Sequence, residues 1–112
     1  MNVNAMIIKA LEGFGYPVVY GTYTGDATTY ISFGYETYPD DYANDAPEHE
    51  VYLIDVHLFC PREMDTVKLC AQIKRALANA GLEYPGMLDA EDEDGKHFVF
   101  ETKAVGGTNG AD

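Results

Sequence analysis

The fold of this chain is decided by the stretch Val51-Tyr52-Leu53-Ile54-Asp55-Val56-His57-Leu58-Phe59-Cys60. Side chains alternate between the two faces of a β-strand, and one face here carries Tyr52, Ile54, Val56, Leu58 and Cys60. This apolar face predicts a strand over Glu50–Cys60 that packs on the core. The opposite face carries Val51, Leu53, Asp55, His57 and Phe59. Because it is half apolar, we expect part of it to be covered too, by a surface such as another chain.

The flanking sequence predicts two helices and four further strands. The predicted elements before Glu50 are a helix over Asn4–Glu12, a short strand over Pro17–Tyr20 and a strand over Thr29–Tyr35. Those after Cys60 are a helix from Arg62 or Glu63 to Ala80, closed by Gly81, and a hairpin of Leu82–Ala90 against Lys96–Val105 that turns at Asp94-Gly95. The core stripe expected on the second helix is Leu69, Cys70, Ile73, Leu77 and Ala80.

These elements predict one α+β domain over residues 1–105, with residues 106–112 as a flexible tail. The expected architecture is a mixed, mostly antiparallel sheet of about five strands packed against two helices. A chain of 112 residues is long enough for one hydrophobic core and too short for a second.

A long acidic segment separates the second and third predicted strands. It contains no Lys or Arg, and its carboxylates are Glu36, Asp40, Asp41, Asp45, Glu48 and Glu50. A connection of about 15 residues is longer than most connections in compact domains and is typically functional or disordered. Tyrosines and prolines lie within it, and aromatic side chains are favoured at contact surfaces. The sequence therefore predicts a long acidic loop that acts as a contact arm.

Composition excludes several classes of partner. The formal net charge is -12, from 7 Lys and Arg residues against 19 Asp and Glu residues, whereas binding to nucleic-acid phosphates or anionic membranes needs clustered positive charge. No stretch approaches the roughly 18 apolar residues of a membrane-spanning helix. Cys60 and Cys70 lack metal-binding or redox spacing, and no signal peptide is apparent. We therefore expect a cytosolic chain with reduced thiols that pack as small hydrophobes.

The second predicted helix carries a second, weakly apolar stripe of Met64, Val67, Ala71 and Ala78, joined by Lys74. Arg62, Lys68, Lys74 and Arg75 lie on the same segment, whereas no other basic residue lies between Lys9 and Arg62. A basic helix and an acidic arm on one chain suit head-to-tail contacts between copies, which close into a ring when the rotation allows. The alternative is a solvated, charged helix surface. The predicted interface residues are Tyr38, Asp40, Asp41, Tyr42 and Asp45 on the arm and Val67, Ala71, Lys74, Arg75 and Ala78 on the helix.

Candidate chemistry is sparse in the sequence. Asp55 and His57 share one strand face, a spacing that suits an acid/base pair or two metal ligands. The alternative is a polar pair on the strand surface, which we prefer because hydrolase and metalloprotease motifs are absent. The acidic residues before Gly95 do not match the spacing of a calcium loop, and His49 and His97 are isolated along the sequence. We therefore expect no catalytic, cofactor or metal site.

The order of elements and several local strings resemble a known family. The strings are Pro17-Val18-Val19-Tyr20-Gly21, Thr29-Tyr30-Ile31-Ser32-Phe33, Ala43-Asn44-Asp45 and Val51 to Phe59, followed by a helix and a terminal hairpin. Over residues 1–105 they are similar to the small tail-completion, or tail-terminator, proteins that join tails to heads in long-tailed bacteriophages. The acidic richness of the arm departs from the family pattern and leaves open whether the arm docks on a partner or lines the channel.

The resemblance implies a non-enzymatic structural protein of a phage or prophage tail. It implies a homo-oligomeric ring, commonly a hexamer, that contacts the tail tube protein and the head-connector protein. Its expected locations are the tail and neck of the virion and, during assembly, the cytoplasm of the bacterial host. The negative charge would repel the DNA that passes through the ring.

Two other functions fit parts of the sequence. An acidic inhibitor that mimics DNA and blocks a nucleic-acid enzyme would also need a large excess of carboxylates. Mimicry usually spreads this charge over a whole face, whereas the acids here concentrate in two segments, residues 36–50 and 89–94. A small metal-dependent enzyme would use Asp55 and His57 and would bind zinc or manganese tightly.

Overall fold

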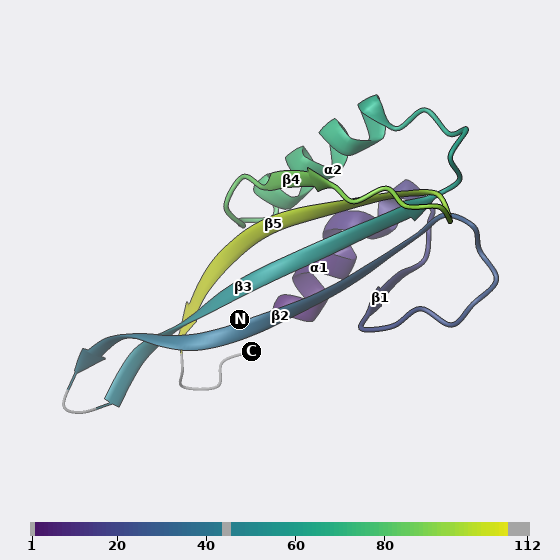
Figure 1. Cartoon of the computed structure of the whole chain (residues 1–112). Helices are drawn as coiled ribbons and strands as arrows, with labels where there is room; N and C mark the ends of the chain where they lie inside the picture. Colours follow the sequence, from purple (N-terminus) through teal and green to yellow (C-terminus); the bar gives the residue numbers. More distant parts are fainter. Residues whose placement is uncertain (1, 44–45, 108–112) are drawn as a thin grey trace.

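The computed structural model shows a five-stranded sheet with two helices on one of its faces (Figure 1). It describes residues 2–43 and 46–107, and for residues 40–43, 46–48 and 107 it describes the backbone alone. The helices are α1 (Val3–Leu11) and α2 (Val67–Asn79), and a 3-10 turn, Glu12–Phe14, follows α1. The strands are β1 (Val18–Tyr20), β2 (Tyr30–Ala43), β3 (Ala46–Cys60), β4 (Gly86–Asp89) and β5 (Lys96–Gly107). The predicted α+β architecture is confirmed.

The sheet has the strand order β1-β2-β3-β5-β4, with β3 at its centre. Within the described residues, β1 and β2 pair in parallel, and the other three strand pairs are antiparallel. The register places Phe33, Val56 and Phe100 side by side on one face, and Gly34, Asp55 and Glu101 side by side on the other. The predicted assignment of β3 side chains to two faces is therefore confirmed.

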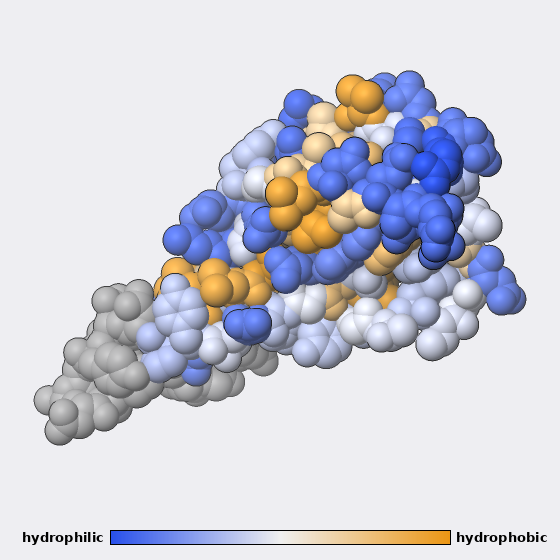
Figure 2. Space-filling view, viewed as in Figure 1, coloured by the Kyte–Doolittle hydropathy of each residue, from blue (hydrophilic) through white to orange (hydrophobic). Residues whose placement is uncertain are grey.

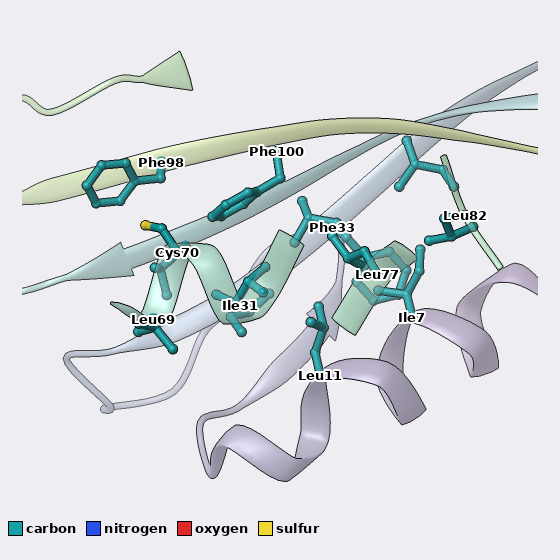
Figure 3. Close-up of a cluster of buried hydrophobic side chains, with 14 of the residues drawn as sticks. Ile7, Leu11, Ile31, Phe33, Leu69, Cys70, Leu77, Leu82, Phe98 and Phe100 are labelled. Carbon is teal, nitrogen blue, oxygen red and sulfur yellow. The ribbon is translucent and has the colours of Figure 1, made fainter. Parts of the chain in front are cut away.

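The core lies between the helices and the first of these faces. Figure 3 shows Phe98 and Phe100 of β5 and Ile31 and Phe33 of β2 pointing toward the helices. The buried helix residues are Val3, Ile7 and Leu11 of α1 and Leu69, Cys70, Ile73 and Leu77 of α2. Cys60 and Cys70 are buried free thiols, as the sequence predicts, and burial raises both pKa values.

Helix α2 begins later than the sequence predicts, at Val67 rather than at Arg62 or Glu63. The preceding residues are held by the β4–β5 connection and by the start of β5. The Arg62 guanidinium donates to Glu91 Oε2 at 2.7 Å and to the Asp92 carbonyl at 2.6 Å, and the Lys96 ammonium donates to the Met64 carbonyl. With these contacts, residues 62–63 form a turn and residue 64 a bend in place of the first turn of the helix.

The end of α2 agrees with its sequence signal. Gly81 has a φ of 103°, its N–H donates to the Ala78 carbonyl at 3.0 Å, and the Leu82 N–H donates to the Leu77 carbonyl at 3.2 Å. This pair of bonds is the Schellman motif, which needs a left-handed residue that is usually glycine.

The predicted terminal hairpin forms, with a bridge between Asp92 and Gly95 beside its turn. Gly95 has a φ of 145°, and a Cβ there would lie 2.9 Å from the Cys60 carbonyl oxygen, so this position requires glycine. Strand β5 continues through Gly107, opposite His49. The expectation that the tail starts at residue 106 is therefore wrong for Gly106 and Gly107, because both continue the ladder with β3, and residues 108–112 lie outside the described residues.

The predicted acidic loop is instead an extension of the sheet. Strands β2 and β3 stay paired through Pro39 and Glu50, Tyr42 and Pro47, and Ala43 and Ala46. We call residues 40–43 and 46–48, which extend beyond the end of β5, the ribbon. Figure 1 shows it projecting from the body, and the molecule measures 54 × 24 × 24 Å. The loop prediction was wrong because cross-strand pairing continues despite residues that disfavour strands.

None of the helices in residues 2–43 and 46–107 is long and apolar enough to span a membrane.

The core predicts a large loss of stability on truncation of Phe100. Its side chain is fully buried, so Phe100→Ala should lower the free energy of unfolding by about 3–5 kcal/mol. Leu88→Ala, which removes an apolar side chain that is 56% exposed, should change it by less than about 1 kcal/mol. Urea unfolding followed by circular dichroism measures both, and equal losses would contradict the assigned core.

Candidate interaction surface

The predicted helix residues lie on the outer side of α2. Val67 is 82% exposed, Ala71 and Arg75 are exposed, and Lys74 and Ala78 are half-buried. The most open stripe adds Lys68 and Gln72 to Ala71 and Arg75, residues that neighbour one another at helical spacing. Helix α2 contains no Asp or Glu, so its outer side is a positively charged surface on an acidic molecule.

Met64 does not belong to this outer stripe. Its side chain packs against the core, and its sulfur accepts a hydrogen bond from Thr29 Oγ1 at 3.7 Å. The prediction for Met64 was wrong because α2 begins three residues later. Met64 therefore lies outside the helix, and the helical spacing that was used to predict the stripe does not apply to it.

The predicted arm residues belong to strand β2 and its continuation. Tyr38 is 46% exposed and pairs with Val51, on the sheet face opposite the helices. Asp40, Asp41 and Tyr42 lie in the ribbon backbone, their side chains are not described, and Asp45 lies outside the described residues. Tyr38 and the α2 residues therefore lie on different surfaces of one molecule and can meet only between copies.

We call the sheet face opposite α1 and α2 the open face. At one end of it, aromatic rings stack across three strands, and we call this set the aromatic row. Its centroid distances are 4.4 Å from Tyr23 to Tyr30, 4.8 Å from Tyr30 to Phe59 and 4.1 Å from Phe59 to His97. His57 completes the row, with its Nδ1 hydrogen-bonded to His97 Nε2 at 2.8 Å.

The His57–His97 pair changes the interpretation of two predicted features. His97 is not isolated, because the register brings it diagonally across from His57. His57 bonds to His97 and not to Asp55, which is exposed on the same face. Among the described residues, no three His, Cys, Asp or Glu side chains are grouped as a metal site would require. The geometry thus gives Asp55 and His57 no shared chemistry.

Burial lowers the pKa of His97, and the neighbouring His57 lowers it further, while the Asp92 carboxylate raises it. Partial burial penalises the charged imidazolium, and a second cation beside it is repelled. Both causes make the His97 imidazole harder to protonate than an ordinary histidine.

Beside the aromatic row, the open face is hollowed into a groove of about 550 Å³. Gly34 lies in it, next to Asp55 and Glu101, and the following row contains Glu36, Leu53 and Lys103. Leu53 is 43% exposed, and Figure 2 shows hydrophobic surface at the end of the body from which β2 and β3 project. The groove therefore combines an apolar patch with a surplus of carboxylates.

The acidic turn between β4 and β5 is locally organised. Asp89 Oδ1 accepts the Glu91 N–H at 2.9 Å, and Asp92 Oδ1 accepts the Asp94 N–H at 2.8 Å. Side-chain bonds of this kind stabilise turns. These carboxylates therefore have a structural role in the hairpin connection.

Neither the models of known protein families nor the curated proteins include a match to this chain.

Sequence reasoning missed the groove and the aromatic row. The alternation in β2 and β3 correctly assigns Gly34, Asp55 and His57 to the open face, but it does not say which strand lies beside β3. The missing information was the β3–β5 register, which places Glu101 opposite Asp55 and His97 opposite Phe59. A glycine inside a strong strand pattern was the one local signal, because such a glycine often marks a close approach of another backbone.

The His57–His97 pair predicts opposite shifts in two variants. His57→Phe removes the neighbouring imidazole that lowers the pKa of His97 and should raise that pKa, whereas Asp92→Asn removes the carboxylate that raises it and should lower it further. NMR titration of the His97 ring protons measures both. Movement of both pKa values in the same direction would contradict this arrangement.

The lowered pKa of His97 also sets the direction of a pH effect on stability. In the unfolded chain His97 binds a proton near pH 6.5, whereas in the folded chain it binds one only at a lower pH. His97 therefore reduces the free energy of unfolding as the pH falls through that value. His97→Phe should make the loss between about pH 7.5 and 5.5 smaller than in the wild type, as urea unfolding at each pH would show.

Proposed function

We propose that this chain is a non-enzymatic structural component of a long-tailed phage or prophage tail. In this proposal, copies of the chain form a homo-oligomeric ring, commonly a hexamer in the family that the sequence resembles. The ring ends the tail tube or joins it to the head connector. Its partners are a second copy, the tail tube protein and the head-connector protein.

The observation that carries this proposal is the projecting ribbon together with an open face. A two-stranded ribbon that projects alone is marginally stable at best, and packing against another surface stabilises it. The open face offers exposed Tyr38, Leu53 and Val105 where the ribbon leaves the body. Both features suit contacts between subunits or between rings.

The distribution of charge supports a head-to-tail arrangement. The outer side of α2 is basic, whereas the open-face groove is mainly acidic. Two different, complementary surfaces on one chain form heterologous contacts, and these close into rings at a suitable rotation. The net charge of -12 would keep such a ring from holding the phosphates of DNA in its channel.

The ring predicts annular particles of the purified protein. Sedimentation over a range of concentrations should show a defined oligomer, and negative-stain electron microscopy should show rings with a central opening. A chain that remains monomeric and competes with DNA for a nuclease would instead support the acidic inhibitor and would overturn the ring.

Shortening the ribbon should separate folding from joining. Replacing residues 41–48 by Asn-Gly, a favoured two-residue hairpin turn, closes the hairpin on the Asp40–His49 pair and keeps every β3–β5 pair. We expect a folded protein whose phage or prophage accumulates unjoined heads and tails, counted by electron microscopy.

The matched control for the shortened ribbon is Glu93→Gln with Asp94→Asn, which removes carboxylates at the opposite end of the molecule and should leave joining intact. Normal joining by the shortened protein would exclude the ribbon from this role, and an unfolded product would show that the ribbon is needed for the fold.

A further inference from the structure

Gly34 lies in the middle of β2, and no contact within the described chain explains a glycine there. It carries no left-handed φ, and a Cβ built on it would meet nothing within 4 Å. Glycine weakens a strand interior, and one common reason for its presence is the close approach of another backbone. The space over Gly34 is therefore a place where a second chain can come close to the sheet.

The carboxylates beside Gly34 indicate the charge of that second chain. Asp55 and Glu101 lie directly opposite each other on neighbouring strands, an arrangement of like charges that destabilises a sheet. In the part of the chain that the structure describes, neither has an ion pair or a side-chain hydrogen bond, and Lys103 pairs with Glu83 at 3.5 Å instead. A cationic partner would relieve this repulsion.

We propose that the groove over Gly34 receives the outer side of α2 from a second copy of this chain. Lys68 and Arg75 are exposed on that side, and small Ala71 lies between them. The small side chain lets the helix backbone approach Gly34 while the two cations reach the carboxylates of the groove. This inference rests on the proposed ring, because it names the two surfaces that meet between neighbouring subunits.

The spacing of the charges on the two surfaces agrees with this docking. Lys68 and Arg75 are seven residues apart, which corresponds to about 10 Å along a helix. Glu36 on β2 and Glu101 on β5 are two strand spacings apart, with β3 between them, and two residues apart along the strand direction, which together is about 12 Å on a sheet. A helix that crosses the strands can therefore place one cation near each carboxylate, with Leu53 of the groove beneath it.

Filling the groove tests whether the groove is an interface between copies of the chain. A Cβ at Gly34 would meet nothing within 4 Å and would face the open groove, so Gly34→Phe should keep the fold, as circular dichroism and urea unfolding would verify. By occupying the space that α2 needs, it should raise the dissociation constant of the oligomer at least about tenfold. The control is Gly13→Phe, at a second glycine with open space around it, and it should leave the dissociation constant unchanged.

A charge exchange tests whether α2 is the occupant. Arg75→Glu and Glu101→Lys should each weaken self-association about tenfold or more, because each places like charges together. Their combination should restore most of the affinity, since it rebuilds an opposite pair across the interface. Lys9→Glu, an equal change of charge on exposed α1, should have little effect.

The outcomes distinguish this inference from the ring itself. A wild-type oligomer that tolerates Gly34→Phe overturns the groove as an interface and leaves the ring standing. If Gly34→Phe weakens the oligomer but the charge exchange restores nothing, the groove binds a surface other than α2, and the inference is wrong. A wild-type chain that is monomeric at every concentration tested overturns both the inference and the ring.

Discussion

Strands β2 and β3 are longer than both helices, and this difference in length determines the shape and the exposed surfaces of the molecule. Strands β2 and β3 contain 14 and 15 residues, or about 45–50 Å of extended chain. Helices α1 and α2 contain 9 and 13 residues, or about 14 and 20 Å. The helices also pack on one face only. The sheet therefore extends past the helices at one end, and neither helix packs on its opposite face.

Local patterns in the sequence were sufficient to predict the strand and helix residues that form the core. The alternation in β3 assigned Ile54, Val56 and Leu58 to the core because period two leaves no other face for them, and the helical spacing of Leu69, Ile73 and Leu77 identified their partner surface. The Schellman signal at Gly81 fixed the end of α2. Each of these features depends on short-range physics, in which neighbouring residues along the chain determine the conformation.

The ribbon and the groove depend on pairing between residues far apart in the sequence, and no local pattern reveals this pairing. Pro39 and Pro47 argue against a strand, yet proline is tolerated where its missing N–H would face away from the partner. Among the described residues, β2 after Phe33 and β3 before His49 each pair on one edge only. The start of α2 was misplaced for a similar reason, because Arg62 and Lys96 bond to partners 29 and 32 residues away in the sequence. The groove and the His57–His97 contact likewise arise from the β3–β5 register alone.

Charge separation within the chain favours assembly over mimicry of DNA. A mimic needs carboxylates at phosphate-like spacing along an uninterrupted surface, whereas the open face interrupts its acids with Lys103, His57 and apolar Leu53. The basic side of α2 would also be superfluous on such a molecule, since it repels the cationic sites that a mimic must enter. In the proposed head-to-tail contact, by contrast, the same basic side would neutralise the repulsion between Asp55 and Glu101. The proposed contact between copies therefore gives both charged surfaces a role, whereas mimicry of DNA gives a role to the acidic surface alone.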